Sequence, residues 1–135
     1  MNTYNINDMN FINSSLYQQY INENPKVGFL KIRAYTASGA VPITNLKVTI
    51  SKIIDNNNVI FFEGLTDSSG VIDKIVLPTP TISTDDLTEP KGATYNVIAN
   101  YNGTNYNYIV NIYENVLVVQ PINIIPRMMG DNNGY

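Results

Sequence analysis

The sequence predicts an all-β domain, a sandwich of antiparallel sheets built from seven strands. Short runs rich in Val, Ile, Tyr and Thr recur from Val27 onward, and clusters of Gly, Pro, Asn or Asp bound each run. Within the runs, apolar and polar residues alternate, as they do in strands with one buried face. Strands at such short spacing are typical of sandwiches. The length of 135 residues suits a single domain.

The first two runs show the alternation most clearly. We expect one set of side chains to face the core in each run and the intervening set to face outward. The residues expected to face inward are Leu30, Ile32 and Ala34 in the first run and Leu46, Val48 and Ile50 in the second. The predicted strands cover residues 27–36, 46–54, 59–65, 71–77, 94–101, 106–113 and 116–125.

The segments between the runs have the residues that tight turns require. Residues 55–58 and 66–70 are rich in Asp, Asn, Ser and Gly, which favour turns. Asn102-Gly103 is the strongest hairpin signal in the chain. Residues 78–80 hold two prolines that end the fourth run, and residues 81–92 form a predicted long loop.

The two ends of the chain differ from this body. Residues 1–26 form a predicted amino-terminal arm, residues 27–126 the sandwich, and residues 127–135 a tail. Ser15 and Gln18 fit a capping box, which predicts a short helix over residues 16–23. A helix this short needs a surface to dock on, either in the same chain or in a second copy. The residues on one of its faces are Leu16, Tyr17, Tyr20 and Ile21.

Composition argues against several functions. The chain has no His and no Cys, which removes the commonest general base and the usual transition-metal ligands, so we predict no catalysis, no cofactor and no metal. The net charge of −3, with scattered Lys and Arg, argues against nucleic-acid binding. No signal peptide or membrane-length apolar run occurs in the sequence, so we expect synthesis in the cytoplasm without general secretion.

Several motifs together resemble a known family. They are Gly28-x-Leu30-x-Ile32, Gly39-x-x-Pro42-Ile43, Thr66-Asp67-x-x-Gly70, Leu77-Pro78, Tyr95-x-Val97-x-Ala99 and Val119-Gln120-Pro121-Ile122-Asn123-Ile124-Ile125-Pro126. Residues 27–126 resemble the carboxypeptidase regulatory-like domain, a transthyretin-like (prealbumin-like) sandwich related to Cna-B modules. The Thr66-Asp67-x-x-Gly70 turn and the closing strand from Gln120 to Pro126 resemble the copies in clostridial spore-associated proteins. The resemblance implies a non-catalytic accessory or structural module.

Two special sites implied or allowed by these motifs are disfavoured. Cna-B relatives can form a Lys–Asn crosslink beside an acid, and Lys31, Asn123 and Glu63 are the trio to consider here. Lys31, however, has the outward phase of its strand. The turn at residues 66–70 with Asp73 offers too few carboxylates for calcium, so we expect Asp67 and Gly70 to be structural turn residues, as we do Asn102 and Gly103.

Tyrosine is the most suggestive feature, since the chain has 10 Tyr and no Trp. Tyr favours interfaces, although packing within a sheet is an equal alternative. The predicted interface residues are Tyr4, Ile6, Phe11, Leu16, Tyr17, Tyr20, Ile21, Tyr101, Tyr106 and Tyr108.

Two functions from different classes follow. The first is a structural subunit that forms a homo-oligomer or polymer through its sheet edges and its arm, for example on the spore surface with other spore-surface proteins. Residues 2–12 are the part of the arm that could add as a strand to a neighbour. The second is a monomeric module that binds a carbohydrate, through Tyr101, Tyr106 and Tyr108, or a partner enzyme acting on peptidoglycan. A phage or contractile-particle accessory protein is a third reading that the sequence does not separate from the first.

Overall fold

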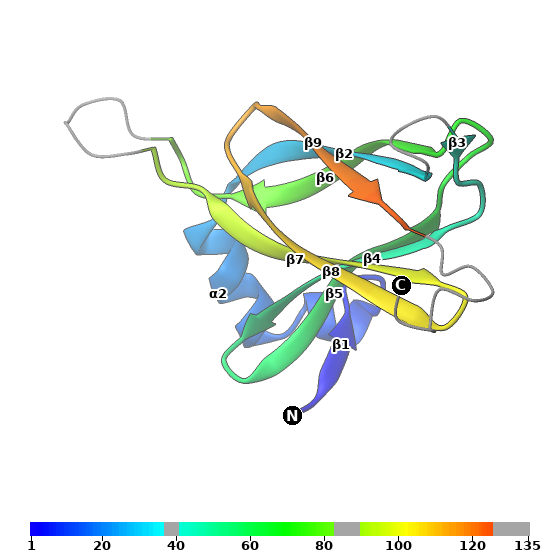
Figure 1. Ribbon diagram of the computed structural model, residues 1–135. Helices are drawn as coiled ribbons and strands as arrows, with labels where there is room; N and C mark the ends of the chain where they lie inside the picture. The colour runs from blue at the N-terminus through cyan, green and yellow to red at the C-terminus, as the bar shows by residue number, and fades with distance from the viewer. Residues whose placement is uncertain (37–40, 83–89, 126–135) are drawn as a thin grey trace.

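The computed structural model describes residues 1–36, 41–82 and 90–125, and in these ranges the protein is mostly β (Figure 1). Three segments lie outside the described residues: 37–40, which follow the first predicted strand, most of the predicted loop at 81–92, and the predicted tail at 127–135. The elements are, in order, β1 (Thr3–Asn5), α1 (Met9–Ile12), α2 (Ser15–Glu23), β2 (Lys26–Thr36), β3 (Val41–Pro42), β4 (Lys47–Ile54), β5 (Asn57–Leu65), β6 (Val71–Thr79), β7 (Ala93–Tyr101), β8 (Thr104–Ile112) and β9 (Leu117–Asn123).

Two sheets pack against each other in a sandwich-like arrangement. The first has five strands in the order β1-β5-β4-β7-β8, and the second has four, with β6 and β9 on either side of β2 and the short β3 against the end of β2. All seven predicted strands are present, with boundaries shifted by a few residues. β3 and the single-turn helix α1 were not predicted, because they are too short to show a period. Residues 2–12 were considered as a strand added to a neighbouring copy, whereas β1 adds to β5 of the same chain.

The prediction of purely antiparallel sheets was wrong. β1 pairs with β5 in parallel, and β9 pairs with β2 in parallel over seven residue pairs from Phe29↔Leu117 to Tyr35↔Asn123. Alternation along a strand fixes which residues are buried, but it contains no information on the direction of the neighbouring strand. After β8 the chain crosses from one sheet to the other, and this crossing sets the direction of β9 (Figure 1).

The core lies between the two sheets and follows the predicted phase. Leu30, Ile32, Val48 and Ile50 are fully buried, and Ala34 and Leu46 are 2% exposed. β7 contributes Tyr95, Val97 and Ala99, all fully buried, to the same cluster. A bulge in β5 places Ile50 opposite Phe62 and Ser51 opposite Ile60, so that Phe61 is an extra residue on that strand.

The predicted structural turns are confirmed. Oδ1 of Asp67 accepts hydrogen bonds from the backbone N–H groups of Ser69 (2.9 Å) and Val71 (3.0 Å). Gly70 has a φ of 75°, and a Cβ on it would lie 2.3 Å from the carbonyl oxygen of Ala34. Asn102 and Gly103 have φ angles of 52° and 85°, as the two central residues of a type I′ hairpin turn require.

The helix prediction was correct in place and wrong in its cap. α2 spans Ser15–Glu23, but the N-cap is Ser14, whose Oγ accepts a hydrogen bond from the N–H of Tyr17 at 3.3 Å. Gln18 does not close a capping box, because its Nε2 donates to the carbonyl oxygen of Ile12 at 2.7 Å. None of the helices in the described ranges is long and apolar enough to span a membrane.

Candidate functional site

The amino-terminal arm docks on its own sandwich in this structure. β1 adds to the outer side of β5 through the pairs Thr3↔Asn58, Tyr4↔Val59 and Asn5↔Ile60, and α2 lies beside β5 and β7 (Figure 1). Of the predicted interface residues in the arm, Phe11 (4% exposed) and Tyr20 (6% exposed) are buried. The others, Tyr4, Ile6, Leu16, Tyr17 and Ile21, are partly buried against the same core.

A chain of aromatic rings connects the arm to the centre of the sandwich. The rings of Tyr4 and Phe11 stack with centroids 4.8 Å apart, and Phe11 packs on Tyr17 at 5.5 Å. The ring of Phe61 on β5 packs against Tyr17 at 6.5 Å and Tyr20 at 5.7 Å, and contacts Tyr95 edge-on at 5.1 Å. The arm is therefore part of the hydrophobic core, since such aromatic pairs add stabilisation beyond their buried area.

Burial changes the ionisation of the groups at the inner end of this chain. Burial raises the pKa of Tyr20 to about 12, against a lowering effect of its hydrogen bond with Tyr95. Burial also raises the pKa of Tyr95, and lowers that of Lys52, whose Nζ lies 5.5 Å from the centre of the Tyr95 ring and donates to the carbonyl oxygen of Thr94 at 2.7 Å. At neutral pH both phenols are protonated, so these groups serve packing and hydrogen bonding.

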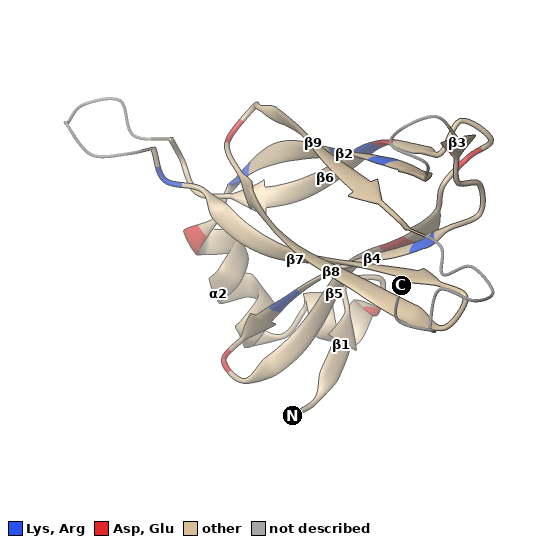
Figure 2. Ribbon diagram, in the orientation of Figure 1, with Lys and Arg blue, Asp and Glu red and all other residues tan. Residues whose placement is uncertain are grey.

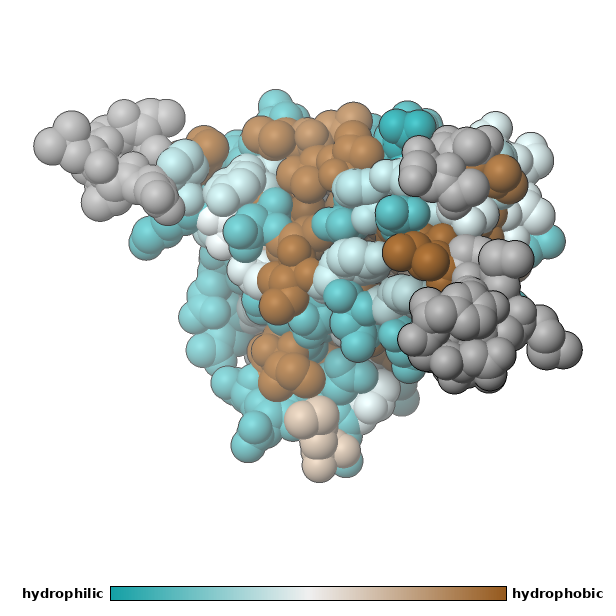
Figure 3. All heavy atoms as spheres, in the orientation of Figure 1, coloured by the Kyte–Doolittle hydropathy of each residue, from teal (hydrophilic) through white to brown (hydrophobic). Residues whose placement is uncertain are grey.

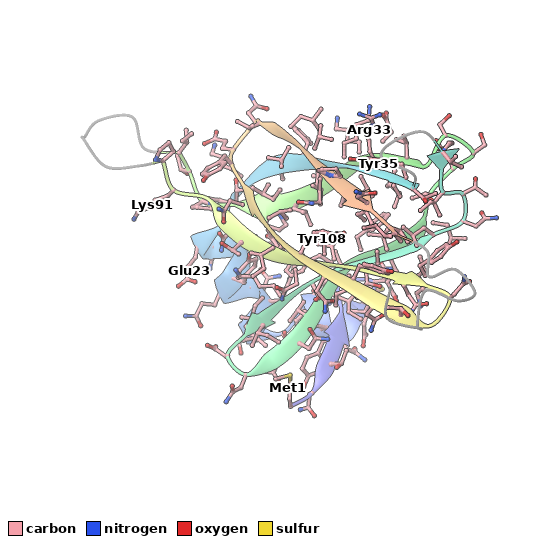
Figure 4. The ribbon with its side chains drawn as sticks, in the orientation of Figure 1. Met1, Glu23, Arg33, Tyr35, Lys91 and Tyr108 are labelled. Carbon is pink, nitrogen blue, oxygen red and sulfur yellow. The ribbon has the colours of Figure 1, made fainter. Side chains whose placement is uncertain are left out.

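The tyrosines of the last hairpin face the interior. Tyr101, Tyr106 and Tyr108 are half-buried against the core. Tyr108 projects from β8 toward β9 (Figure 4), and burial raises its pKa while a hydrogen bond with the backbone of Asn123 lowers it. Their rings are thus engaged in contacts between the sheets.

The sheet edges differ in how they are protected. β1 closes one side of the five-stranded sheet, and β8 has no strand partner beyond β7 among the described residues. β6 has Asp73, Lys74 and Pro78 along its length, and β9 has Pro121. β8 has the sequence TNYNYIVNI, with no charge and no proline in nine residues. Figure 2 shows β7, β8 and β9 without a charged residue.

The flank of the sandwich formed by β8 and β9 also exposes apolar side chains. Ile109 on β8 is 71% exposed, and Leu117 and Val119 on β9 are 53% and 46% exposed. Figure 3 shows hydrophobic surface over β9 and again below it, over β7 and β8, interrupted by hydrophilic residues. These three residues were not among the predicted interface residues, although residues 104–112 contain no charged side chain and this could have indicated an exposed edge.

A hollow of about 600 Å³ lies on the outer face of the five-stranded sheet. It is bordered by Ser51 of β4, Asn58 of β5, Asn96 and Ile98 of β7, and Asn107, Tyr108 and Ile109 of β8. Only Tyr108 among these was a predicted interface residue. The recurrence of Asn at alternate positions of the last hairpin could have identified the polar members.

The structure does not assemble the trio considered for a crosslink. Lys31 on β2 forms an ion pair with Asp73 at 3.7 Å, and Glu63 on β5, in the other sheet, pairs with Lys47 at 3.8 Å. Asn123 is paired with Tyr35, four residues along β2 from Lys31, which is about 13 Å at the rise of a strand. The described residues contain no group of three Asp or Glu side chains placed to hold a metal ion.

No protein-family model matches the chain, and no curated protein matches it in sequence. The resemblance to carboxypeptidase regulatory-like domains therefore stays a prediction.

Proposed function

We propose that the protein is a non-catalytic structural subunit that self-assembles through the edge strand β8. The observation that carries the proposal is the nine-residue edge without charge or proline, beside the exposed apolar residues of β9. Exposed edge strands present unpaired backbone N–H and C=O groups that pair with another chain unless charges, prolines or coverage prevent it. The edges at β6 and β9 have charges or a proline, and β1 is only three residues long. β8 is a nine-residue edge with none of these protections.

The preferred partner of β8 is β8 of a second copy. In a full-length antiparallel pairing of Thr104–Ile112 with itself, the two-fold axis passes at Tyr108, and Asn105 lies opposite Asn111 of the other copy. Such a pairing brings no like charges together, whereas β6 would place charged residues near one another. The product is a sheet of ten strands continuous across two copies.

The position of the arm determines how many sheet edges are free to pair with other copies. While β1 covers β5, sheet pairing is confined to the β8 side. Release of β1 exposes the edge of β5, which allows growth on the other side and so an open filament. The clostridial resemblance favours the spore surface as the place of assembly.

The test introduces charged residues on β8 and, as a control, on the neighbouring strand β7. We expect the natural chain to form dimers or larger oligomers in light scattering, and Asn105→Lys/Asn111→Lys to be monomeric because lysines then face each other across the interface. The matched control is Thr94→Lys/Asn100→Lys, whose positions are exposed and are the direct cross-strand neighbours of Asn111 and Asn105 on β7. It should assemble like the natural chain.

A rescue experiment separates edge pairing from general loss of association. The lysine variant mixed with Asn105→Glu/Asn111→Glu should form a one-to-one heterodimer, since each Lys then faces a Glu. A monomeric natural chain at about 100 μM, well above the Kd of an interface of standard size, would refute the proposal. So would equal assembly by the β7 and β8 lysine variants.

A further inference from the structure

The hollow on the outer face of the five-stranded sheet exists because a small residue lies in a row of larger ones. Across the strands, Ser51 is paired with Ile60 on one side and Asn96 on the other, and Asn96 is paired with Ile109. Ser51 is only 3% exposed, so it lies at the floor and its neighbours form the walls. The volume of about 600 Å³ falls within the range of small-molecule sites.

The asparagines of the hollow differ from those on the rest of this face. Outside the hollow, Nδ2 of Asn100 donates to Oδ1 of Asn105 at 2.8 Å, and Oδ1 of Asn111 accepts from Oγ1 of Thr94 at 2.8 Å. The side chains of the three asparagines in the hollow make no hydrogen bond with any residue in the described ranges. These three are Asn58, Asn96 and Asn107. Each one offers two N–H donors and a carbonyl acceptor to a ligand.

The charge of the hollow limits the ligand class. None of the bordering residues is ionisable at neutral pH, and Lys47 and Glu63 of this sheet pair with each other. Lys52 follows Ser51 on β4 but has the opposite phase, and its Nζ lies over the ring of Tyr95 and donates to the carbonyl oxygen of Thr94. A phosphate or carboxylate ligand would therefore find no counter-charge. Ile98 and Ile109 add apolar surface between the amides.

We propose that this hollow binds a neutral oligosaccharide. Amide side chains match sugar hydroxyls because both groups donate and accept hydrogen bonds, and the two isoleucines fit the C–H faces of the rings. A peptide is a poorer match at this place. Peptides are commonly held by free backbone groups of an edge strand, whereas β4 and β7, which form the floor of the hollow, are paired on both sides. Among the bordering strands in the described ranges, only β8, at one side of the hollow, has an unpaired edge. The hollow shares Asn107, Tyr108 and Ile109 with the proposed β8 interface, but binding in the hollow does not require the assembly.

The test measures the NMR signals of the side-chain amide groups. Isotope-labelled full-length protein is titrated by NMR with chitotriose, cellotriose or maltotriose to about 10 mM, which detects a Kd in the millimolar range. We expect at least one of these trimers to shift the side-chain NH₂ signals of Asn58, Asn96 and Asn107, and to leave those of Asn100 and Asn105 in place. A trigalacturonate control should not bind, because the hollow offers no cation.

Two pairs of variants test whether the shifted NMR signals come from binding in the hollow. Asn96→Ala/Asn107→Ala should weaken binding at least tenfold, whereas the matched control Asn100→Ala/Asn105→Ala, on the same two strands and the same face, should bind like the natural chain. Ser51→Val fills the floor without removing an amide and should also weaken binding, which keeps the test valid if the double variant misfolds. The proposal fails if no neutral trimer shifts these signals, if trigalacturonate binds equally well, or if both alanine pairs behave alike.

Discussion

The hydroxyl of Tyr20 in α2 lies 2.8 Å from the hydroxyl of Tyr95 in β7, which in turn donates to the carbonyl oxygen of Pro78 in β6. Since the proton of Tyr95 is used at Pro78, Tyr20 is the donor to Tyr95. Three hydrogen-bonding groups thus connect the arm, the five-stranded sheet and the four-stranded sheet. Polar groups buried this deeply require each partner to be present.

The order of this relay predicts unequal effects of two conservative variants. Tyr95→Phe removes the middle member, so the hydroxyl of Tyr20 and the carbonyl of Pro78 both lose a partner, and we expect a loss of about 2–3 kcal/mol in the free energy of unfolding. Tyr20→Phe leaves the bond from Tyr95 to Pro78 intact and should cost about 1 kcal/mol. Denaturant unfolding measures both. An equal or larger cost for Tyr20→Phe would contradict the direction of the relay.

The same pair predicts a loss of stability at alkaline pH. Burial raises the folded-state pKa of Tyr20 to about 12 and also raises that of Tyr95, above the ordinary value of 10.0. A raised pKa contributes stability that is fully present below pH 10 and is lost as the pH rises toward 12. The free energy of unfolding should therefore fall over this range. In Tyr20→Phe/Tyr95→Phe the fall should be smaller, and an identical fall in both proteins would show that other groups cause it.

Substitutions at two glycines separate the cost of a steric clash from the cost of backbone strain. Gly70 and Gly103 both have positive φ, but a Cβ on Gly70 would meet the backbone of Ala34 at 2.3 Å, whereas a Cβ on Gly103 has nothing within 4 Å. Gly103→Ala should cost about 1 kcal/mol from strain alone. Gly70→Ala adds the steric clash and should cost about 3 kcal/mol or more. Thermal unfolding of the two variants decides the point, and similar costs would contradict it.

The docked arm makes a prediction about α1. Phe11 is 4% exposed and stacks on Tyr4, so Phe11→Ala should cost about 3 kcal/mol or more in the free energy of unfolding. Met9, on the same short helix, is 70% exposed, and Met9→Ala should change stability by less than about 0.5 kcal/mol. If Phe11→Ala were equally neutral, the arm would not be docked in solution as it is here.

Features that depend on a residue's own neighbours in the chain could be predicted from the sequence. Alternation located Leu30, Ile32, Val48 and Ile50 in the core, and Asn102-Gly103 defined its hairpin, because both features depend on local geometry. The parallel pairing of β9 with β2 and the docking of Tyr20 on Tyr95 join residues far apart in the sequence. No local period reports on such contacts, so neither could be predicted.

The same distinction between local and long-range contacts applies to the candidate sites. The tyrosine-rich hairpin was noticed, but the rings of Tyr101, Tyr106 and Tyr108 turned toward the core. The hollow depends on Ser51 from β4 lying beside Asn96 from β7, which requires the strand order of the sheet. Choosing Ser14 over Ser15 as the cap of α2 was a matter of one residue, which sequence patterns resolve poorly.

The link between α2 and β2 has a consequence for exchange between copies. Only Asn24 and Pro25 separate Glu23 from Lys26, and two residues reach about 7 Å when extended. A released arm therefore remains at high effective concentration near its own docking surface, and recapture by the same copy outcompetes capture by a distant one. An arm can dock on a second copy only when the docking surface of that copy already lies within reach of this short linker. Pairing of the sheet edges must therefore come first, and exchange of the arms second.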